Sequence, residues 1–356
     1  MKRKGLLVTI IAGTLCLLAC FLAYYRTIMV STDKGYILHL KTAGYLVGGL
    51  IAGYLVHNVL HELGHALFAR LSGARVFEIA FWGLRLSKGK IRFEKSSAYA
   101  GWTSFVPLSP QNTVKATSFS LIGGFVGSLA VLIIIFVGFF VTDVYLDYYV
   151  ALIWVGALIS TIYMIAVNFL SSAPGTDGRM LGVGGRTMPN DYLSKLVTLE
   201  YQSHLLNGRS LNDVESLTFD CGIENRNVTH EDVLLCLERC ETERAKELIE
   251  RALKQEELAD NEHIALLLEW FFICCIENNT ENVKRLLPQI EGLLLMPTSE
   301  PLILRCAVFY RRLNGETAWA EALEKTYFKA CENYPLPGLG KTERMIFFKY
   351  SNLQQE

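Results

Sequence analysis

The stretch His57-Asn58-Val59-Leu60-His61-Glu62-Leu63-Gly64-His65 is the one around which the rest of the chain is organised. It contains the pattern His-Glu-x-x-His, inside an apolar run that begins near Tyr45. If this run is a helix, His61 and His65 lie four residues apart and present their imidazoles on one face. The two side chains are therefore candidate ligands of a single metal ion.

Glu62 adds a candidate base next to the first ligand, where its carboxylate could take a proton from a metal-bound water. Two histidine ligands with a glutamate base are the arrangement of zinc hydrolases. Ionisable side chains are costly inside an apolar helix, so their presence here favours a functional site. His57, one turn earlier, could compete for the metal, but a packed or water-facing histidine is the simpler interpretation. Four other histidines have no partner at ligand spacing and are interpreted as ordinary: His39, His204, His230 and His263.

The composition divides the chain into a membrane part and a soluble part. Of the 356 residues, 51% are hydrophobic, and the net charge of −1 gives no indication of nucleic-acid binding. Apolar residues dominate up to about Leu170, and charged residues become common after about Asp191. The nine cysteines include no Cys-x-x-Cys pair, which favours reduced, buried thiols in a cytosolic domain. We therefore expect a polytopic α-helical membrane protein followed by a soluble all-α domain.

Apolar runs predict about four membrane spans. The first follows the basic start Met1-Lys2-Arg3-Lys4 and is long enough to be retained as a transmembrane helix. The second carries the His-Glu-x-x-His pattern near its far end, and its glycines 44, 48, 49 and 53 form a small-residue face for helix packing. The four predicted spans are residues 5–25, 41–71, 119–141 and 148–170.

A polar insert, residues 72–118, separates the second span from the third. Alternating patterns at residues 76–82 and 90–94 predict strands, with turns at Gly83 and at Lys88-Gly89. The insert is therefore expected to form a small β-hairpin sheet next to the membrane.

Basic residues predict the orientation in the membrane. They cluster between the second and third spans, whereas the turn at residues 142–147 contains none. The positive-inside rule then puts the amino terminus, the insert and everything after Leu170 in the cytoplasm, with His61 and His65 near the cytoplasmic face. The basic residues concerned are Arg70, Arg75, Arg85, Lys88, Lys90, Arg92, Lys95 and Lys115.

Asp177 is the candidate third ligand. It follows the fourth span in the stretch Ser171-Ser172-Ala173-Pro174-Gly175-Thr176-Asp177-Gly178, where serine, proline and glycine break the helix at the membrane edge. Irregular backbone at that depth is tolerated only where it is buried in protein or lines a cavity. A catalytic zinc takes three protein ligands and a water, and His61, His65 and Asp177 supply that number. The alternative is that Asp177 only caps a helix beginning at Gly178.

The remaining residues, 191–356, read as amphipathic helices. The last two helical pairs recur at a spacing in the range of helical-hairpin repeats. Asn314-Gly315-Glu316, followed by Ala320, Ala330 and Pro335, resembles the second helix of a tetratricopeptide repeat. We expect a solenoid-like domain that binds a cytoplasmic protein partner. The chain then divides into a first helix and outer loop (1–40), a membrane core (41–190) and a cytoplasmic helical domain (191–356). The expected helices are residues 192–206, 230–240, 241–255, 261–277, 281–296, 300–313 and 316–333.

Residues 44–180 resemble the site-2 protease group of intramembrane zinc metalloproteases. That family pairs His-Glu-x-x-His with an Asn-x-x-Pro segment that leads to Asp-Gly, and here Asn168 and Asp177-Gly178 stand at those positions. Its Gly-Pro-x-x-Asn stretch is echoed by Gly124-Phe125-Val126-Gly127-Ser128. There are departures: Ser171 and Phe125 replace prolines, Ser128 replaces asparagine, and the gap to Asp177 is longer.

The resemblance implies one Zn²⁺ ion and hydrolysis of a peptide bond in or near the transmembrane segment of a membrane-protein substrate. It implies that Glu62 is the general base and that Asn168 holds the substrate strand or the oxyanion through its amide. The hairpins at residues 76–94 could accept the unwound substrate as an added strand. The protein would be a multi-pass protein of the cell membrane with its active site toward the cytoplasm. The composition and short loops would suit a bacterial plasma membrane.

Two alternatives remain open from the sequence. The first is a catalytically silent membrane scaffold that presents its helical domain to cytoplasmic partners, but a chain without catalysis would be free to lose Glu62. The second is another kind of membrane zinc enzyme, with a downstream glutamate as third ligand. Glu78 and Glu94 lie on the right side of the membrane for that role, but they belong to the predicted sheet.

Overall fold

The computed structural model describes residues 36–87, 89–93, 101–141, 148–170, 177–180, 190–219, 222, 224, 226–254 and 260–353. The chain divides into two compact units. One comprises Met1–Val106 with Val114–Pro189, and the other comprises Pro107–Thr113 with Asn190–Glu356. The predicted span at residues 5–25 lies outside the described residues, and the division of roles among residues 1–40, 41–190 and 191–356 stays a prediction.

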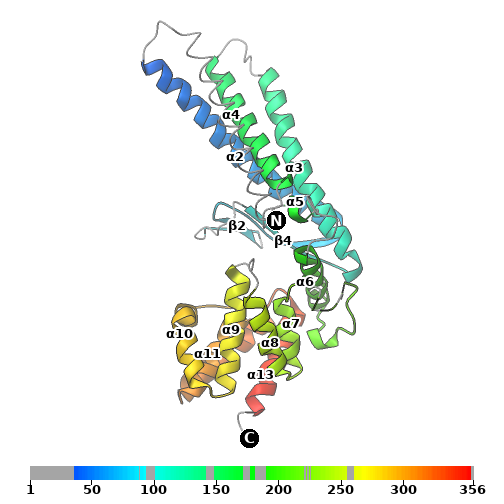
Figure 1. Cartoon of the computed structure of the whole chain (residues 1–356), viewed down its shortest axis with the longest axis vertical. Helices are drawn as coiled ribbons and strands as arrows, with labels where there is room; N and C mark the ends of the chain where they lie inside the picture. The colour runs from blue at the N-terminus through cyan, green and yellow to red at the C-terminus, as the bar shows by residue number, and fades with distance from the viewer. Residues whose placement is uncertain are drawn as a thin grey trace. The chain divides into compact units, whose positions relative to one another are not determined.

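Within the described residues, the first unit contains three helices that are long and apolar enough to cross a membrane (Figure 1). They are α2 (Tyr36–Leu71), α3 (Thr113–Val141) and α4 (Tyr148–Ile165), which continues into the π-helical turn η2 (Ala166–Leu170). The apolar parts, Lys41–Leu71, Pro110–Val141 and Tyr149–Phe169, agree with the second, third and fourth predicted spans. These elements fit a helical membrane protein.

Small residues let α2 approach both neighbouring helices closely. A Cβ built at Gly49 would lie 2.2 Å from the carbonyl oxygen of Ile153 on α4. A Cβ built at Gly64 would lie 2.1 Å from the carbonyl oxygen of Gly123 on α3. Only glycine fits at such contacts, because a side chain would force the helices apart. The predicted small-residue face is therefore half right: Gly49 and Gly53 pack on α4, whereas a Cβ at Gly44 or Gly48 would meet nothing within 4 Å.

The polar insert forms a four-stranded sheet with the strand order β3-β2-β1-β4. Strands β1 (Ala74–Phe81), β2 (Leu84–Ser87) and β3 (Lys90–Phe93) form antiparallel hairpins, as the alternating pattern predicts. The turns use left-handed backbone at Gly83 (φ 81°) and Gly89 (φ 70°), a conformation that glycine adopts without strain. The remaining strand, β4 (Gly101–Pro107), was not predicted, and it forms the other edge of the sheet.

The last residues of the predicted β insert are helical. A short 3₁₀ turn, η1 (Pro110–Asn112), leads directly into α3 at Thr113, so the helix begins before Phe119, where the apolar run starts. The Thr113 hydroxyl donates to the carbonyl oxygen of Pro110 over 2.6 Å. Apolarity alone could not locate this start, because the first turn of α3 carries polar residues such as Lys115.

Between Asn190 and Leu353 the described regular structure is all helical, and each helix from α7 to α13 contacts the next. If the helices are grouped as the pairs α7–α8, α9–α10 and α11–α12, the first helix of each pair contacts the first helix of the next: α9 contacts both α7 and α11. The predicted helices are all found within a few residues of their expected bounds, and α13 was not predicted. The helices are α6 (Asn190–Leu206), α7 (His230–Glu238), α8 (Thr242–Leu253), α9 (Asp260–Ile276), α10 (Thr280–Leu295), α11 (Pro301–Leu313), α12 (Thr317–Glu332) and α13 (Pro337–Leu353).

A buried charge cluster ties four of these helices together. Arg305 on α11 has no exposed surface, and its guanidinium lies 2.8 Å from carboxylate oxygens of both Glu269 on α9 and Glu343 on α13. His230, at the start of α7, lies 3.0 Å from Glu269, a partner that the local spacing in the sequence could not indicate. Burial opposes protonation of His230, but the hydrogen bond and charge of Glu269 outweigh it and raise the pKa of the imidazole. Buried charges of this kind need their partners, since an unpaired one is expensive.

Candidate metal centre

His61 and His65 lie on one face of α2, as the spacing predicts, and both are buried. Their Nε2 atoms are 3.1 Å apart. The carboxylate of Glu62 belongs to the same buried group, in which the ligand atoms all lie within 4.8 Å of one another. The helix therefore presents two nitrogens and a carboxylate to one small volume.

Asp177 completes a triangle with the two histidines. It is the first residue of α5 (Asp177–Met180), and its Oδ2 lies 3.4 Å from His61 Nε2 and 3.3 Å from His65 Nε2. A tetrahedral zinc with bonds of about 2.0–2.1 Å holds its ligand atoms about 3.3–3.4 Å apart. The spacing of the three atoms is close to that around one zinc ion. If Asp177 only capped a helix, its carboxylate would not need to lie near either histidine.

The hydrogen bonds behind the rings determine which nitrogen carries the proton. His61 Nδ1 lies 3.1 Å from the carbonyl oxygen of Gly124, and His65 Nδ1 lies 2.8 Å from that of Ser120. A carbonyl oxygen only accepts, so in the neutral rings the protons reside on Nδ1 and the lone pairs on Nε2. Two nitrogen lone pairs and the Asp177 carboxylate then converge at 3.1–3.4 Å. Such a set repels itself unless a shared proton or a cation lies between its members, and two nitrogens with one carboxylate oxygen are donors that suit a divalent metal such as zinc.

Helix α3 supports the histidines through residues spaced four apart. The Ser128 hydroxyl lies 3.0 Å from His61 Nδ1 and donates to the carbonyl oxygen of Gly124, which leaves its lone pair for the imidazole N–H. Gly124 itself faces the centre: a Cβ there would lie 2.5 Å from His65 Nε2. The sequence predicted Gly124 and Ser128 only as an echo of a family stretch. Ser120 was missed, although Ser120, Gly124 and Ser128 share a helical face.

Thr103 on β4 contacts the candidate base. Its hydroxyl lies 2.8 Å from Glu62 Oε2 and 3.0 Å from the Glu62 carbonyl oxygen. Nothing in the sequence signalled this pair, because it depends on how the sheet packs against α2. The contact gives the unpredicted strand a direct connection to the site.

Asn168 is not tied to this centre by any hydrogen bond among the described residues. It is half-buried in the π-helical turn η2, one residue before Phe169, whose ring lies 5.8 Å from that of His61. Its role stays an expectation that comes from the family resemblance.

The other candidate ligands have different surroundings. His57 is fully buried with its ring stacked on His61 at 5.7 Å, so it is a packed histidine. Glu78 lies 3.3 Å from Arg85 in the sheet, so its carboxylate is paired with a guanidinium. Glu94 lies outside the described residues.

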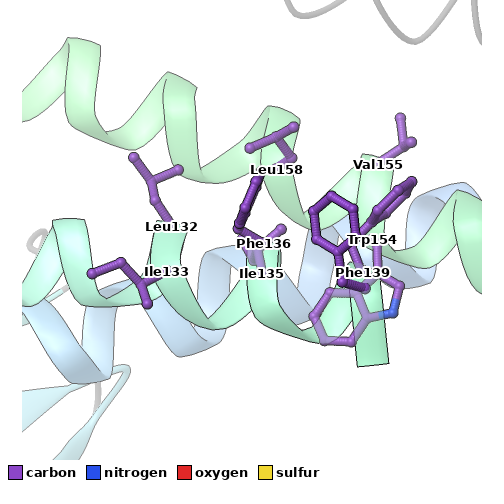
Figure 2. Close-up of a pocket in the computed structure, with 9 residues that line it drawn as sticks. Leu132, Ile133, Ile135, Phe136, Phe139, Trp154, Val155 and Leu158 are labelled. Carbon is purple, nitrogen blue, oxygen red and sulfur yellow. The ribbon is translucent and has the colours of Figure 1, made fainter. Parts of the chain in front are cut away.

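A separate cavity of about 530 Å³ lies between α3 and α4, farther along α3 than Ser128 (Figure 2). Its lining is entirely aliphatic and aromatic, with side chains from both helices facing the space. It contains no candidate ligand or base, so it is not part of the centre. The lining residues are Leu132, Ile133, Ile135, Phe136, Phe139, Phe140, Trp154, Val155 and Leu158.

Comparison of the chain with protein-family models, with curated proteins and with solved structures gave no match.

Proposed function

We propose that this protein is an intramembrane zinc metalloprotease of the site-2 protease kind. The observation that carries the proposal is the convergence of His61 Nε2, His65 Nε2 and Asp177 Oδ2 at 3.1–3.4 Å, beside a buried glutamate. Three protein ligands leave one position of a tetrahedral metal open, which is typical of catalytic zinc. A structural zinc site, which leaves no position open, would use four protein ligands.

The chemistry divides between the ligands and the base. A zinc ion bound there would lower the pKa of a water molecule and polarise the scissile carbonyl. Glu62 takes the proton of the attacking water and passes it to the leaving amine. Asn168 holds the substrate strand or the developing oxyanion through its amide, a role that comes from the family resemblance alone.

The substrate in this proposal is a membrane protein whose transmembrane segment unwinds locally. A helix keeps its carbonyls in hydrogen bonds, so the bond to be cut must first become extended. Strand addition to a sheet edge stabilises an extended segment through main-chain hydrogen bonds. The sheet offers two edges, and β4 is the better candidate because its Thr103 contacts Glu62.

The rest of the chain supports a membrane-bound, cytoplasm-facing enzyme. With residues 5–25 as a further helix, the protein would cross the membrane about four times, with the centre and the helical domain on the cytoplasmic side of a bacterial plasma membrane. The contacts between successive helix pairs in the second unit suit a solenoid of the tetratricopeptide kind. Such a domain would bind a cytoplasmic protein partner and so recruit or restrain the protease.

The test is a cleavage assay with the full chain, loaded with zinc and reconstituted in lipid vesicles. The probes are fluorescein-labelled casein and a panel of transmembrane peptides that carry a fluorophore and a quencher. Glu62→Gln should lower kcat by at least about 100-fold, because general acid–base catalysis contributes about 10²–10⁴-fold. Glu243→Gln is the matched control, since the Glu243 side chain is 82% exposed on α8. Equal rates for Glu62→Gln and the unmodified chain would favour the scaffold.

A further inference from the structure

Strand β4 contacts the Glu62 carboxylate through two residues of one strand face. Successive side chains of a strand alternate between faces, so Gly101 and Thr103 lie on the same side. The Thr103 hydroxyl lies 2.8 Å from Glu62 Oε2, and a Cβ built at Gly101 would lie 2.8 Å from Oε1. One oxygen is therefore held by a hydrogen bond, and the other packs over Gly101, where a Cβ would force the Glu62 side chain to shift.

The direction of the Thr103 hydrogen bond is determined by its acceptors. The carboxylate and the carbonyl oxygen of Glu62 both accept, so the threonine hydroxyl is the donor and shares its proton between them. The same contact ties the Glu62 side chain to its own backbone, so the carboxylate cannot rotate freely. The hydrogen bond to Oε2 thereby restricts the orientation in which the carboxylate can receive a proton.

We propose that Thr103 is a positioning residue for catalysis: it holds the Glu62 carboxylate in the orientation that proton transfer requires. The inference rests on the proposed function, because the group that Thr103 positions is the general base of that reaction. Proton transfer requires the base within hydrogen-bond reach of the proton, and a displacement of about 1 Å can cost about 10²-fold in rate. Among the described residues, Thr103 hydrogen-bonds to Glu62 and to none of the three proposed ligands, so its loss should change the rate without changing metal binding.

Three substitutions separate this role from a merely structural one. Thr103→Val keeps the shape of the side chain and removes the donor, whereas Thr103→Ser keeps the donor. Ser104→Ala is the matched control, because Ser104 is the next residue on the strand and is exposed on the opposite face. Each is measured in the reconstituted full chain for kcat, KM, zinc content and melting temperature.

Thr103→Val should lower kcat by about 10- to 100-fold at unchanged KM, zinc content and melting temperature. Thr103→Ser should restore kcat to within about twofold, and Ser104→Ala should match the unmodified chain. In a Glu62→Gln background, Thr103→Val should cause no further loss, because residues that act as a unit are not additive.

The outcomes distinguish this inference from the proposed function. An active protein in which Thr103→Val keeps its full kcat would overturn the role of Thr103 and leave the protease intact. Loss of zinc or of thermal stability in step with kcat would also overturn it, since Thr103 would then be a structural residue. An unmodified chain no faster than Glu62→Gln on every probe would overturn the proposed function, and the positioning role with it.

Discussion

Replacing Gly124 by alanine should weaken zinc binding at the proposed metal centre, although none of the three proposed ligands is itself replaced. A Cβ at this position would lie 2.5 Å from both Cε1 and Nε2 of His65, and 3.0 Å from Cε1 of His61. Non-bonded heavy atoms are comfortable at about 3.5 Å or more, so the His65 ring would have to move by about 1 Å. Metal bonds in proteins tolerate deviations of only about 0.2 Å. The new methyl group therefore displaces a ligand by several times what the metal allows.

Helix α3 cannot relieve the contact by moving away. Its neighbouring glycines are already in close contact with α2: a Cβ at Gly123 would lie 2.2 Å from the Gly64 carbonyl oxygen, and one at Gly127 would lie 2.2 Å from that of Leu60. Retreat would lose this packing, and overpacking of a tight interface typically costs about 1–3 kcal/mol. We expect the affinity for zinc to fall by at least about 10- to 100-fold, the range seen when groups that support a ligand are lost.

The assay is zinc retention by the full-length protein against a chelator of known affinity, with melting temperature measured alongside. Gly48→Ala is the matched control. Gly48 lies on α2, the helix that carries the histidines, and a Cβ at this position would meet no atom within 4 Å. The control should retain zinc as the unmodified chain does. Retention of zinc at unchanged affinity by Gly124→Ala would refute the geometry on which the centre is built.

Two further predictions concern the helical unit of the full-length protein. Arg305→Met should destabilise this unit by about 3–5 kcal/mol, because it removes the guanidinium that pairs with the buried carboxylates of Glu269 and Glu343. Hydrogen exchange in α9 measures the loss, and unchanged protection of its amides would contradict the prediction. The pKa of His230 is raised in the folded state, so protonated His230 stabilises the fold. This stabilisation should be fully present below the unfolded-state pKa of about 6.5, and it should be lost as the pH rises through the higher folded-state pKa. The melting temperature should therefore fall less between about pH 6 and 9 in His230→Gln than in the unmodified chain. Equal falls in the two proteins would contradict the pairing of His230 with Glu269.

Local patterns in the sequence were enough to predict the helices and the first hairpins. Apolarity and a period of 3.6 residues locate the span Lys41–Leu71, and the two histidines share a face for the same reason. Alternation and glycine turns predict β1 and β3. Each of these features depends on residues that are close together in the chain.

Features that depend on tertiary packing were harder to predict. Strand β4 matters because Thr103 reaches Glu62, and this pairing exists only once the sheet packs on α2. Ser120 supports His65 only through the register between α3 and α2. The partner of His230 is Glu269, which lies on another helix.

Helix α13 was missed for a different reason. It begins at Pro337 and contains two early glycines, a composition that usually indicates a turn. Proline is tolerated in the first turn of a helix, and Gly338 is required because a Cβ there would lie 2.0 Å from the Arg209 carbonyl oxygen. Long-range packing overrides the local signal at this position.

If His61, His65 and Asp177 together hold one zinc ion, the metal content of the protein must depend on all three residues. Zinc should be measured per chain in the purified full-length protein, together with His61→Ala and Asp177→Ala. We expect about one zinc in the unmodified chain and a loss in both variants, which would show that two distant segments form one site. Zinc that is lost only with His61 would make Asp177 a helix cap. A well-folded chain that binds no zinc would exclude the proposed zinc site and favour the catalytically silent scaffold.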